Sequence, residues 1–498
     1  MPTAADPRAA CIIGVARQTW HPAEVPEGAP EPLAMWEGVA RQAAADAEAT
    51  GGPDAVLGAL ESIDVVYSQS WQYDDPPARL AERLGATPAR GAYSGIGGSV
   101  PQVLAAGIAT SIGAGDLDLA LLVGAEALAT VRRMKKAGEK PQWSHKPAER
   151  RPFPMDLRFH PSEISHAVFE AYLTFALFDN ARRAALGRGL DEHRLQLGAI
   201  LSRLTDVAAQ SPYAWFPIAR TAAEISTATP DNRMVAYPYT KLMTSIMDVD
   251  MAAGLVIASA DKADALGVPD DKRVYLRGFG YAEDPAHVAD HGDLSRSPAM
   301  ATASSAALAG ARIGIDDVAH LDLYSCFASS VNFALDALGM TEDDPRSVTQ
   351  TGGLPYHGGP GSNYMTHSIA AMAETLRADP GSFGLTSGVG MHMQKHAYGL
   401  WSSDPGAALV DVPTSPGVAD EATSIIESPQ GLATVATYSV LHGRDGEPES
   451  AVVICDVSGG GRCYAKFDGD LAEIETDELI GRTVALTPND GVNVARLS

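Results

Sequence analysis

The chain repeats one alternation of short apolar runs with amphipathic segments, and this rhythm constrains the fold more than any other feature. Near the start, the apolar runs Cys11–Arg17 and Ile63–Gln69 flank the helical pattern Pro32–Ala49. Strands that alternate with helices indicate a layered α/β fold. The rhythm returns from about residue 247 to 394, which predicts that one α/β unit is used twice.

Two regions depart from this rhythm. The region from about 130 to 235 is rich in Arg, Pro and Trp and carries an amphipathic run from His166 to Leu186, so we expect an inserted, mostly helical region there. Beyond about residue 412, five strand-like runs follow, separated by turn sequences such as GRDGEP and SGGGR, with a helical pattern at Leu471–Ile480. Five such strands predict a small closed barrel of the OB type.

Composition bounds the class of protein. With 498 residues, 45% hydrophobic and 20% charged, the chain is long enough for about three folded domains and is not disordered. It contains no apolar run of 18 residues and no basic-then-apolar leader, so we expect neither a membrane span nor a secretory signal. Four cysteines are too few for a disulfide scaffold and favour a reducing, cytoplasmic location.

The charge is strongly acidic overall but uneven. A net charge of −25 disfavours nucleic acid as a partner, because phosphate backbones would be repelled. Between Arg132 and Arg151, however, eight Lys/Arg against two Glu give a net of +6. Between Trp401 and Ser498, sixteen Asp/Glu against five Lys/Arg give −11. An acidic chain with one basic segment therefore needs a local explanation for that segment.

Six stretches, in order, resemble motifs of the thiolase superfamily, and most closely those of its sterol-carrier-protein type. They are CIIGVARQTW, LLVGAEAL, PYTKLMTSIMDVDMAAGLVIAS, DLYSCFASSVNFALDALG, TGGLPYHGGPGSN and LTSGVGMHM. The resemblance covers about Ala10–Trp401, and the added barrel matches a subgroup, the thiolase-like proteins of type 1. It implies a duplicated thiolase fold, layered αβαβα, with a helical loop-domain insertion and a small C-terminal OB-like β-barrel.

The resemblance also implies domain limits and a loss of the usual chemistry. The expected domains are an N-terminal thiolase half (1–130 and 235–270), a loop domain (131–234), a C-terminal half (271–411) and the barrel (412–498). Thiolases use a nucleophilic Cys at a helix N-terminus, a His in a G-H-P motif and a second Cys as acid/base. The matching positions here hold Gly98, Gly359 and Thr386.

Polar residues near these positions have two interpretations each. Ser99 and Gln102 have the spacing of a capping box that opens a helix, and a replacement nucleophile at Ser99 is the less favoured alternative. Tyr324 stands where the family has a His, and is expected either to donate to a carbonyl or to pack in the core. His357 either approaches the pocket or bonds to backbone as a loop residue.

The remaining candidates are weaker. Tyr356 and Ser387 are further polar candidates for the catalytic site. His392 and His396 have the spacing of a metal pair on a helix, but their stretch resembles a strand entering a turn and offers no third ligand. We therefore expect no metal.

The basic segment is the candidate coenzyme A contact, because the thiolase loop domain cradles the nucleotide end of that cofactor. Arg132, Arg133, Lys135 and Lys136 are expected to neutralise its phosphates, and Trp143 to stack on its adenine. The alternatives are a solvated surface loop and a contact with the acidic barrel.

Three functions follow from these observations. The leading hypothesis is a CoA- or acyl-CoA-binding protein of lipid or acyl-CoA metabolism, homologous to acetyl-CoA acetyltransferase but with little or no conventional thiolase activity. A retro-aldolase acting on β-hydroxyacyl-CoA thioesters is the enzymatic alternative, since Tyr324, Tyr356 and His357 offer acid/base groups. The third is a non-catalytic interaction protein whose barrel docks a partner. We expect a monomer or homodimer.

Overall fold

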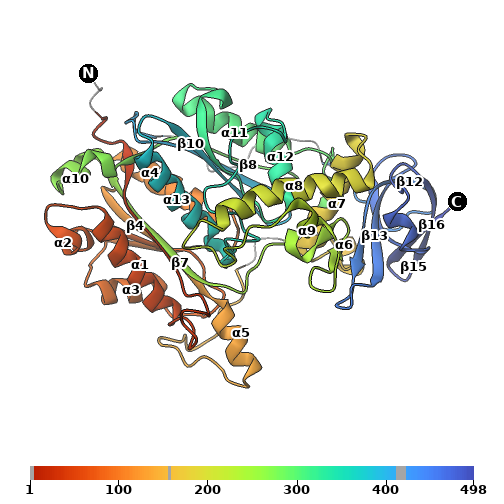
Figure 1. Cartoon of the computed structure of the whole chain (residues 1–498), viewed down its shortest axis with the longest axis horizontal. Coiled ribbons are helices and arrows are strands. Elements are labelled where there is room, and N and C mark those ends of the chain that lie inside the picture. Colours follow the sequence, from red (N-terminus) through yellow and green to blue (C-terminus); the bar gives the residue numbers. More distant parts are fainter. Residues whose placement is uncertain (1–4, 155–158, 411–421) are drawn as a thin grey trace.

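The computed structural model describes residues 5–154, 159–410 and 422–498, which form a layered core with a small barrel at one end (Figure 1). None of the described helices is both long and apolar enough to cross a membrane. The limit expected between the C-terminal half and the barrel, at residues 411 and 412, lies outside the described residues.

The core is built on one nine-stranded sheet in the order β3-β2-β4-β7-β1-β8-β11-β10-β9. The first half of the chain supplies β1 (Ala10–Thr19), β2 (Ser62–Val65), β3 (Arg90–Tyr93), β4 (Leu119–Ala127) and β7 (Asp250–Ser259). The second half supplies β8 (Val274–Glu283), β9 (Val318–Asp322), β10 (Phe383–Gly390) and β11 (Lys395–Ser402). The halves meet where β1 pairs with β8 through Cys11 and Ile12.

The strand directions confirm the predicted duplication. Counted outward from the centre of the sheet, the first half runs β1, β7, β4, β2 and the second half runs β8, β11, β10, β9, so both halves place their first, last, penultimate and second strands in the same order. In both halves the first two pairings are antiparallel and the third is parallel. The halves differ at the outer edge. The first half adds one more parallel strand, β3, beyond β2. In the second half β9 is the edge strand, and directly after it the backbone N–H of Leu323 donates to the carbonyl of Val348, which lies in a loop.

Helices complete the predicted αβαβα layers. The middle layer consists of α4 (Val100–Ala114) and α13 (Tyr364–Ala378), which contact each other and strands of both halves. The outer face of the first half-sheet is covered by α1 (Pro32–Asp46), and that of the second by α11 (Pro298–Ala311). A further helix, α12 (Ala328–Leu338), packs beside α11. The shorter helices of the core are α2 (Gly52–Gly58), α3 (Pro76–Leu84) and α10 (Ala260–Ala265).

The two outer helices approach their strands in the same way. An added Cβ at Gly14 of β1 would overlap the carbonyl of Ala43 in α1, and one at Gly280 of β8 would overlap the carbonyl of Ala303 in α11. Only glycine permits so close a contact between a helix backbone and a strand. These two glycines allow both outer helices to pack tightly against the sheet.

Helices α6 (Pro161–Ser165) to α9 (Ala222–Ser226) of the inserted region and the barrel form the other end of the molecule, whereas α5 (Leu128–Lys136) lies beside the first half of the core (Figure 1). The region also contains α7 (Ala171–Ala185), α8 (Leu190–Ala208), β5 (Met234–Ala236) and β6 (Tyr239–Thr240). The barrel contains β12 (Gly431–His442), β13 (Pro448–Val457), β14 (Arg462–Phe467), β15 (Thr483–Asn489) and β16 (Val492–Leu497). Pairing of β13 with β12 closes it, as predicted, and β5 adds to the edge of β12.

Buried polar groups fasten the barrel to the core. Asn180 of α7 donates to the carbonyl of Tyr438 in β12 at 2.9 Å. The hydroxyl of Tyr464, in β14, donates to Glu163 Oε1 and accepts from the backbone N–H of Ala289, both at 2.8 Å. His287 Nδ1 lies 3.0 Å from the other oxygen of Glu163. One buried carboxylate therefore joins the inserted region, the C-terminal half and the barrel.

The helix predicted at Leu471–Ile480 is wrong, because the structure has only a 3₁₀ turn at Glu473–Glu475. Four acidic side chains crowd this short run, which disfavours a helix. In addition, the hydroxyl of Tyr438 donates to the carbonyl of Ile474 at 2.6 Å, and so occupies an acceptor that a helix would use.

The bridging role of Tyr464 predicts a measurable loss of stability. Tyr464→Phe removes a donor from Glu163 and an acceptor from Ala289, and should lower the free energy of unfolding by about 1–3 kcal/mol. Tyr398→Phe is the matched control, since that hydroxyl is buried with no hydrogen-bond partner among the described residues. Denaturant titration compares the two, and an equal effect of both changes would contradict the bridge.

Candidate functional site

The position that matches the thiolase nucleophile is filled by another residue. Gly98 lies just before α4, and an added Cβ there would come within 2.5 Å of Tyr324 Cζ and would overlap both its hydroxyl and the carbonyl of Val389 in β10. The phenol of Tyr324 thus occupies the space in which a side chain at position 98 would lie. A cysteine is therefore excluded sterically as well as absent.

Tyr324 presents its hydroxyl at this place. It follows β9, its side chain is 6% exposed, and its ring packs edge-on against Tyr364 at 5.6 Å between centroids. Burial raises the pKa of the phenol far above its usual value, so the group is a neutral donor. The structure gives this hydroxyl no hydrogen-bond partner among the described residues.

The predicted capping box at Ser99 is wrong. Ser99 has φ −83° and ψ −11°, already helical, and its side chain makes no capping hydrogen bond. Gln102 instead accepts from the hydroxyl of Thr386 at 2.7 Å, and Trp401 Nε1 donates to that same hydroxyl at 2.9 Å. Thr386 at the second cysteine position is thus held in a buried network that links α4, β10 and β11.

Tyr356 and His357 lie away from Tyr324. The hydroxyl of Tyr356 donates to the carbonyl of Leu242 at 3.0 Å. His357 is fully buried with Nε2 3.4 Å from His367 Nδ1, and burial together with the charge of Arg17 lowers its pKa to about 3. His357 is therefore neutral at physiological pH.

The ring of Tyr364 packs edge-on against both Tyr324 and His357, at 5.6 and 6.1 Å between centroids, and no hydrogen bond joins His357 to Tyr324 in the described part of the chain. At Gly359, in contrast to Gly98, an added Cβ would find its nearest neighbours 3.3 Å away. The two glycines at the predicted family positions therefore differ: the space at Gly98 is filled, whereas a Cβ at Gly359 would require its neighbours to move by only a few tenths of an ångström.

The other polar candidates have structural contacts. The hydroxyl of Ser387 accepts from the backbone N–H of Tyr324 at 2.9 Å. His392 Nδ1 lies 2.7 Å from the hydroxyl of Thr174, and His396 Nε2 lies 3.1 Å from Asp284 Oδ2. Across the described ranges, no group of three or more His, Cys, Asp or Glu side chains gathers as metal ligands do.

Most of the residues expected to bind CoA are engaged locally. Arg132 forms an ion pair with Asp248. Arg133 donates to two backbone carbonyls of the 26–27 loop. Trp143 packs edge-on against Trp71, with 5.7 Å between ring centroids. Lys135 and Lys136 are exposed at the end of α5. The structure does not gather these five side chains into one pocket.

A large pocket lies instead against the second half of the basic segment. We call it the basic pocket; its volume is about 1010 Å³ and it is lined by Tyr67, Gln69, Ser70, Trp71, Gln72, Lys146, Pro147, Ala148, Arg150, Arg151, Pro152 and Phe153. Three of these residues are cations and three are aromatic, and none of the described lining residues is acidic. The same charge run was the signal in the sequence, but the prediction fell on its first cations and not on Lys146, Arg150 and Arg151.

The basic pocket borders the segment that leads to Gly98. The rings of Tyr67 and Phe153 meet edge-on at 5.9 Å between centroids. The backbone N–H of Tyr67 donates to the hydroxyl of Ser94 at 2.9 Å, and an added Cβ at Gly95 would lie 3.9 Å from the carbonyl of Pro154. The pocket wall therefore runs alongside residues 94–95, which lead to Gly98.

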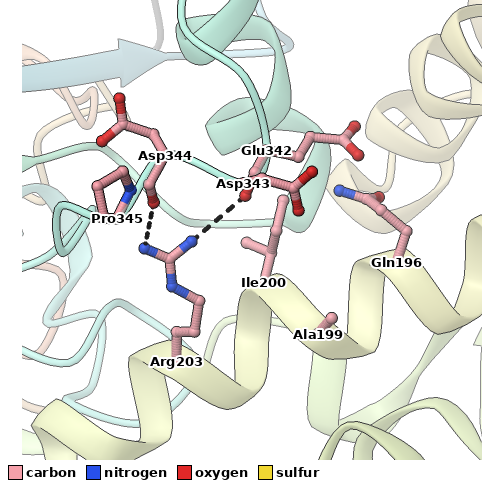
Figure 2. Close-up of a pocket in the computed structure, with 8 residues that line it drawn as sticks. All are labelled: Gln196, Ala199, Ile200, Arg203, Glu342, Asp343, Asp344 and Pro345. Carbon is pink, nitrogen blue, oxygen red and sulfur yellow. Dashed lines mark hydrogen bonds between the residues drawn. The ribbon is translucent and has the colours of Figure 1, made fainter.

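A second pocket, of about 360 Å³, lies between α8 and the loop after α12 (Figure 2). Figure 2 shows the guanidinium of Arg203 turned toward this loop, where it donates to the carbonyls of Glu342 and Asp344 at 3.3 and 2.8 Å. The side chain of Glu342 pairs with Arg182 and Arg188, and that of Asp344 with Arg346. These polar groups are thus paired with one another and hold the loop on α8.

Comparison with known proteins defines the class. The sequence matches no protein-family model and no curated protein. Three solved structures share the fold at low identity: an Ltp2–ChsH2(DUF35) aldolase (TM-score 0.58, 14% identity), the dimeric peroxisomal thiolase of Saccharomyces cerevisiae (0.58, 13%) and an acetyl-CoA acetyltransferase from Syntrophomonas wolfei (0.56, 16%). Each alignment covers 80% of this chain and 98%, 98% and 100% of the other. The chain therefore has the thiolase fold.

A fourth structure resolves the family. A monomeric SCP2-thiolase-like protein type 1 from Mycobacterium smegmatis is 31% identical over 99% of this chain and 100% of its own, with a TM-score of 0.84. The chain belongs to the family of SCP2-thiolase-like proteins of type 1, as its motifs and its added barrel suggested.

The filled position at Gly98 predicts that no larger side chain is tolerated there. Gly98→Ala forces Tyr324 and β10 apart and should lower the free energy of unfolding by about 1–3 kcal/mol, the usual effect of overpacking. Gly359→Ala is the matched control and should cost less, because its added Cβ meets its nearest neighbours at 3.3 Å rather than overlapping them. Chemical denaturation measures both; an equal loss would contradict the role of Tyr324.

Proposed function

We propose that this protein binds coenzyme A or an acyl-CoA thioester and carries out little or no conventional thiolase chemistry. The basic pocket is the observation that carries the proposal. Arginines recognise phosphates with paired hydrogen bonds, and aromatic rings stack on nucleobases. A pocket that offers three cations and three aromatic side chains, in a chain with a net charge of −25, suits an anionic nucleotide.

The position of the basic pocket supports a thioester rather than a free nucleotide. Its wall runs beside residues 94–95, so a ligand whose phosphates contact Arg150 and Arg151 can extend its flexible arm along the segment that leads to Gly98 and Tyr324. About 1010 Å³ is at the large end of ligand pockets, as a nucleotide with a long arm requires. The exposed Lys135 and Lys136 remain a candidate outer contact for the phosphates.

Loss of thiolase activity follows from three positions. Gly98 offers no nucleophile, Gly359 offers no base, and Thr386 is held between Gln102 and Trp401. An acyl-enzyme step needs an activated nucleophile, and its removal eliminates most of the rate enhancement. We accordingly assign the protein to acyl-CoA metabolism as a binder, acting in the cytoplasm and, like the relative from Mycobacterium smegmatis, as a monomer.

A lyase activity is the second candidate, and the Tyr324 hydroxyl favours it. A retro-aldol cleavage of a β-hydroxyacyl thioester breaks the Cα–Cβ bond, releases a carbonyl compound and leaves an enolate that must be stabilised and protonated. A neutral phenol without a partner among the described residues can donate a hydrogen bond to such an oxygen. Tyr356 and His357 contribute less here, because the hydroxyl of Tyr356 donates to Leu242 and Nε2 of His357 lies against His367.

Calorimetric titration with coenzyme A tests the binding proposal. We expect the wild type to bind with micromolar affinity, and Arg150→Ala with Arg151→Ala to weaken binding at least about 10-fold, the equivalent of one charge-assisted hydrogen bond. Lys135→Ala with Lys136→Ala is the matched control, since it removes two cations from outside the basic pocket. Absence of binding to the wild type, or a larger effect of the lysine pair, would overturn the assignment of the pocket.

Mass spectrometry tests the lyase. The protein is incubated with β-hydroxyacyl-CoA thioesters, and cleavage gives a shorter acyl-CoA and an aldehyde or ketone. Tyr324→Phe should abolish the reaction while leaving CoA affinity within about 2-fold, because the ring and its packing remain. Unchanged substrate spectra with the wild type would rule out this second candidate.

A further inference from the structure

Glu126 is a buried acidic residue to which neither the fold nor the proposed function has yet assigned a role. It lies near the end of β4, its side chain is fully buried, and across the described ranges no Lys, Arg or His forms an ion pair with it. Burial raises its pKa to about 7, so that at neutral pH the ionised and the neutral form are both populated. A carboxylate kept in such a place lowers stability, and such groups gather at functional sites.

The segment after β2 surrounds this carboxylate. The backbone N–H of Gln69 donates to Oε1 at 2.7 Å, and that of Ser70 donates to Oε2 at 3.0 Å. The hydroxyls of Ser70 and Ser68 also donate to Oε2, the latter at 3.3 Å. Four donors from three consecutive residues thus converge on one side chain, and the conformation of residues 68–70 depends on it.

These residues form part of the basic pocket. Gln69 and Ser70 line it between Tyr67 and Trp71, and their side of the pocket faces the cations of the 146–151 segment. Glu126 itself is not among the lining residues. A group that touches the wall but not the space inside can shape the pocket without contacting a ligand.

The same carboxylate also touches the other side of the site. An added Cβ at Gly361, where φ is +55°, would lie 2.6 Å from Glu126 Oε1. The next residue, Ser362, accepts from the backbone N–H of Gly97 at 3.0 Å, beside Gly98. Two loops therefore contact Glu126, residues 68–70 and the turn that begins α13, and this turn in its own right binds the backbone of Gly97.

Few other charges act on Glu126. The phenols of Tyr67 and Tyr93, on the β2 and β3 side, have their pKa values raised by burial and further by this carboxylate, so both stay neutral. The paired residue on β7 is Met251, and the turn before α13 presents Gly361 and Ser362. The conformation of residues 68–70 therefore depends on the protonation of a single group, the carboxylate of Glu126.

We propose that Glu126 is a positioning residue of the basic pocket: its ionised carboxylate fixes the backbone N–H groups of Gln69 and Ser70, and thereby sets the wall against which the ligand binds. This inference rests on the proposed function. It adds that a residue outside the pocket determines the affinity for an anionic nucleotide.

The isosteric change Glu126→Gln tests the proposal. The amide keeps one acceptor but directs its NH₂ group at the N–H of the segment, so CoA affinity should fall about 10-fold at pH 8, the effect of one lost charge-assisted hydrogen bond. Asp179→Asn is the matched control: Asp179 is equally buried, pairs with His193 at 3.0 Å and lies outside the pocket, and its change should leave CoA affinity unaltered.

The pH dependence separates positioning from general destabilisation. Glu126 is ionised above its folded-state pKa of about 7 and gains a proton below it. The ratio of the CoA dissociation constants of Glu126→Gln and wild type should thus be about 10 at pH 8 and approach 1 at pH 6. Titration of the CoA phosphates affects both proteins equally and cancels in this ratio.

Amide hydrogen exchange gives a readout that needs no ligand. At pH 8, Gln69 and Ser70 should exchange faster in Glu126→Gln than in wild type, and not in Asp179→Asn. If the wild type does not bind CoA, the proposed function fails, while faster exchange at these two amides still supports the role of Glu126. Unchanged exchange, a ratio that stays constant with pH, or an equal loss of affinity in Asp179→Asn would overturn it.

Discussion

The packing of α4 and α13 between the two half-sheets determines where every residue of the site lies. Both helices contact strands of both halves; α4 begins beside β10, and α13 begins beside β4. The start of α4 carries Gly98 and the start of α13 follows Gly359, so the two family positions come from equivalent helices of a duplicated unit. The closely packed helices leave little space between them, and Tyr324 fills part of what remains.

The core thus keeps the thiolase architecture while the centre has changed its chemical character. A thiolase centre needs a thiolate, and this one offers a neutral phenol and a neutral, fully buried imidazole. Charge is found instead at the periphery, where Arg150 and Arg151 line the basic pocket. Under the proposed function, binding and reaction have separate physical supports in this fold, so that the second can be lost while the first is retained.

Much of this was predictable from local patterns, and the rest depends on contacts distant in sequence. The alternation of strands and helices predicted the duplication, and the residues at positions 98, 359 and 386 showed the loss of the catalytic groups. No local pattern indicates that Tyr324 fills the space above Gly98, because the two residues meet only in the fold. The basic segment was evident, but Arg132 and Arg133 find partners at Asp248 and at nearby carbonyls, so charge alone did not identify which cations face the pocket.

The pairing of β5 with β12 has a practical consequence for dissecting this molecule. The barrel sheet takes its edge from a segment nearly two hundred residues earlier in the chain, and Glu163 loses its Tyr464 donor if the barrel is removed. A chain truncated before β12 would expose an open strand edge and a buried carboxylate that has lost one of its hydrogen-bond donors. The contribution of the barrel is accordingly better probed by point changes on its surface than by its deletion.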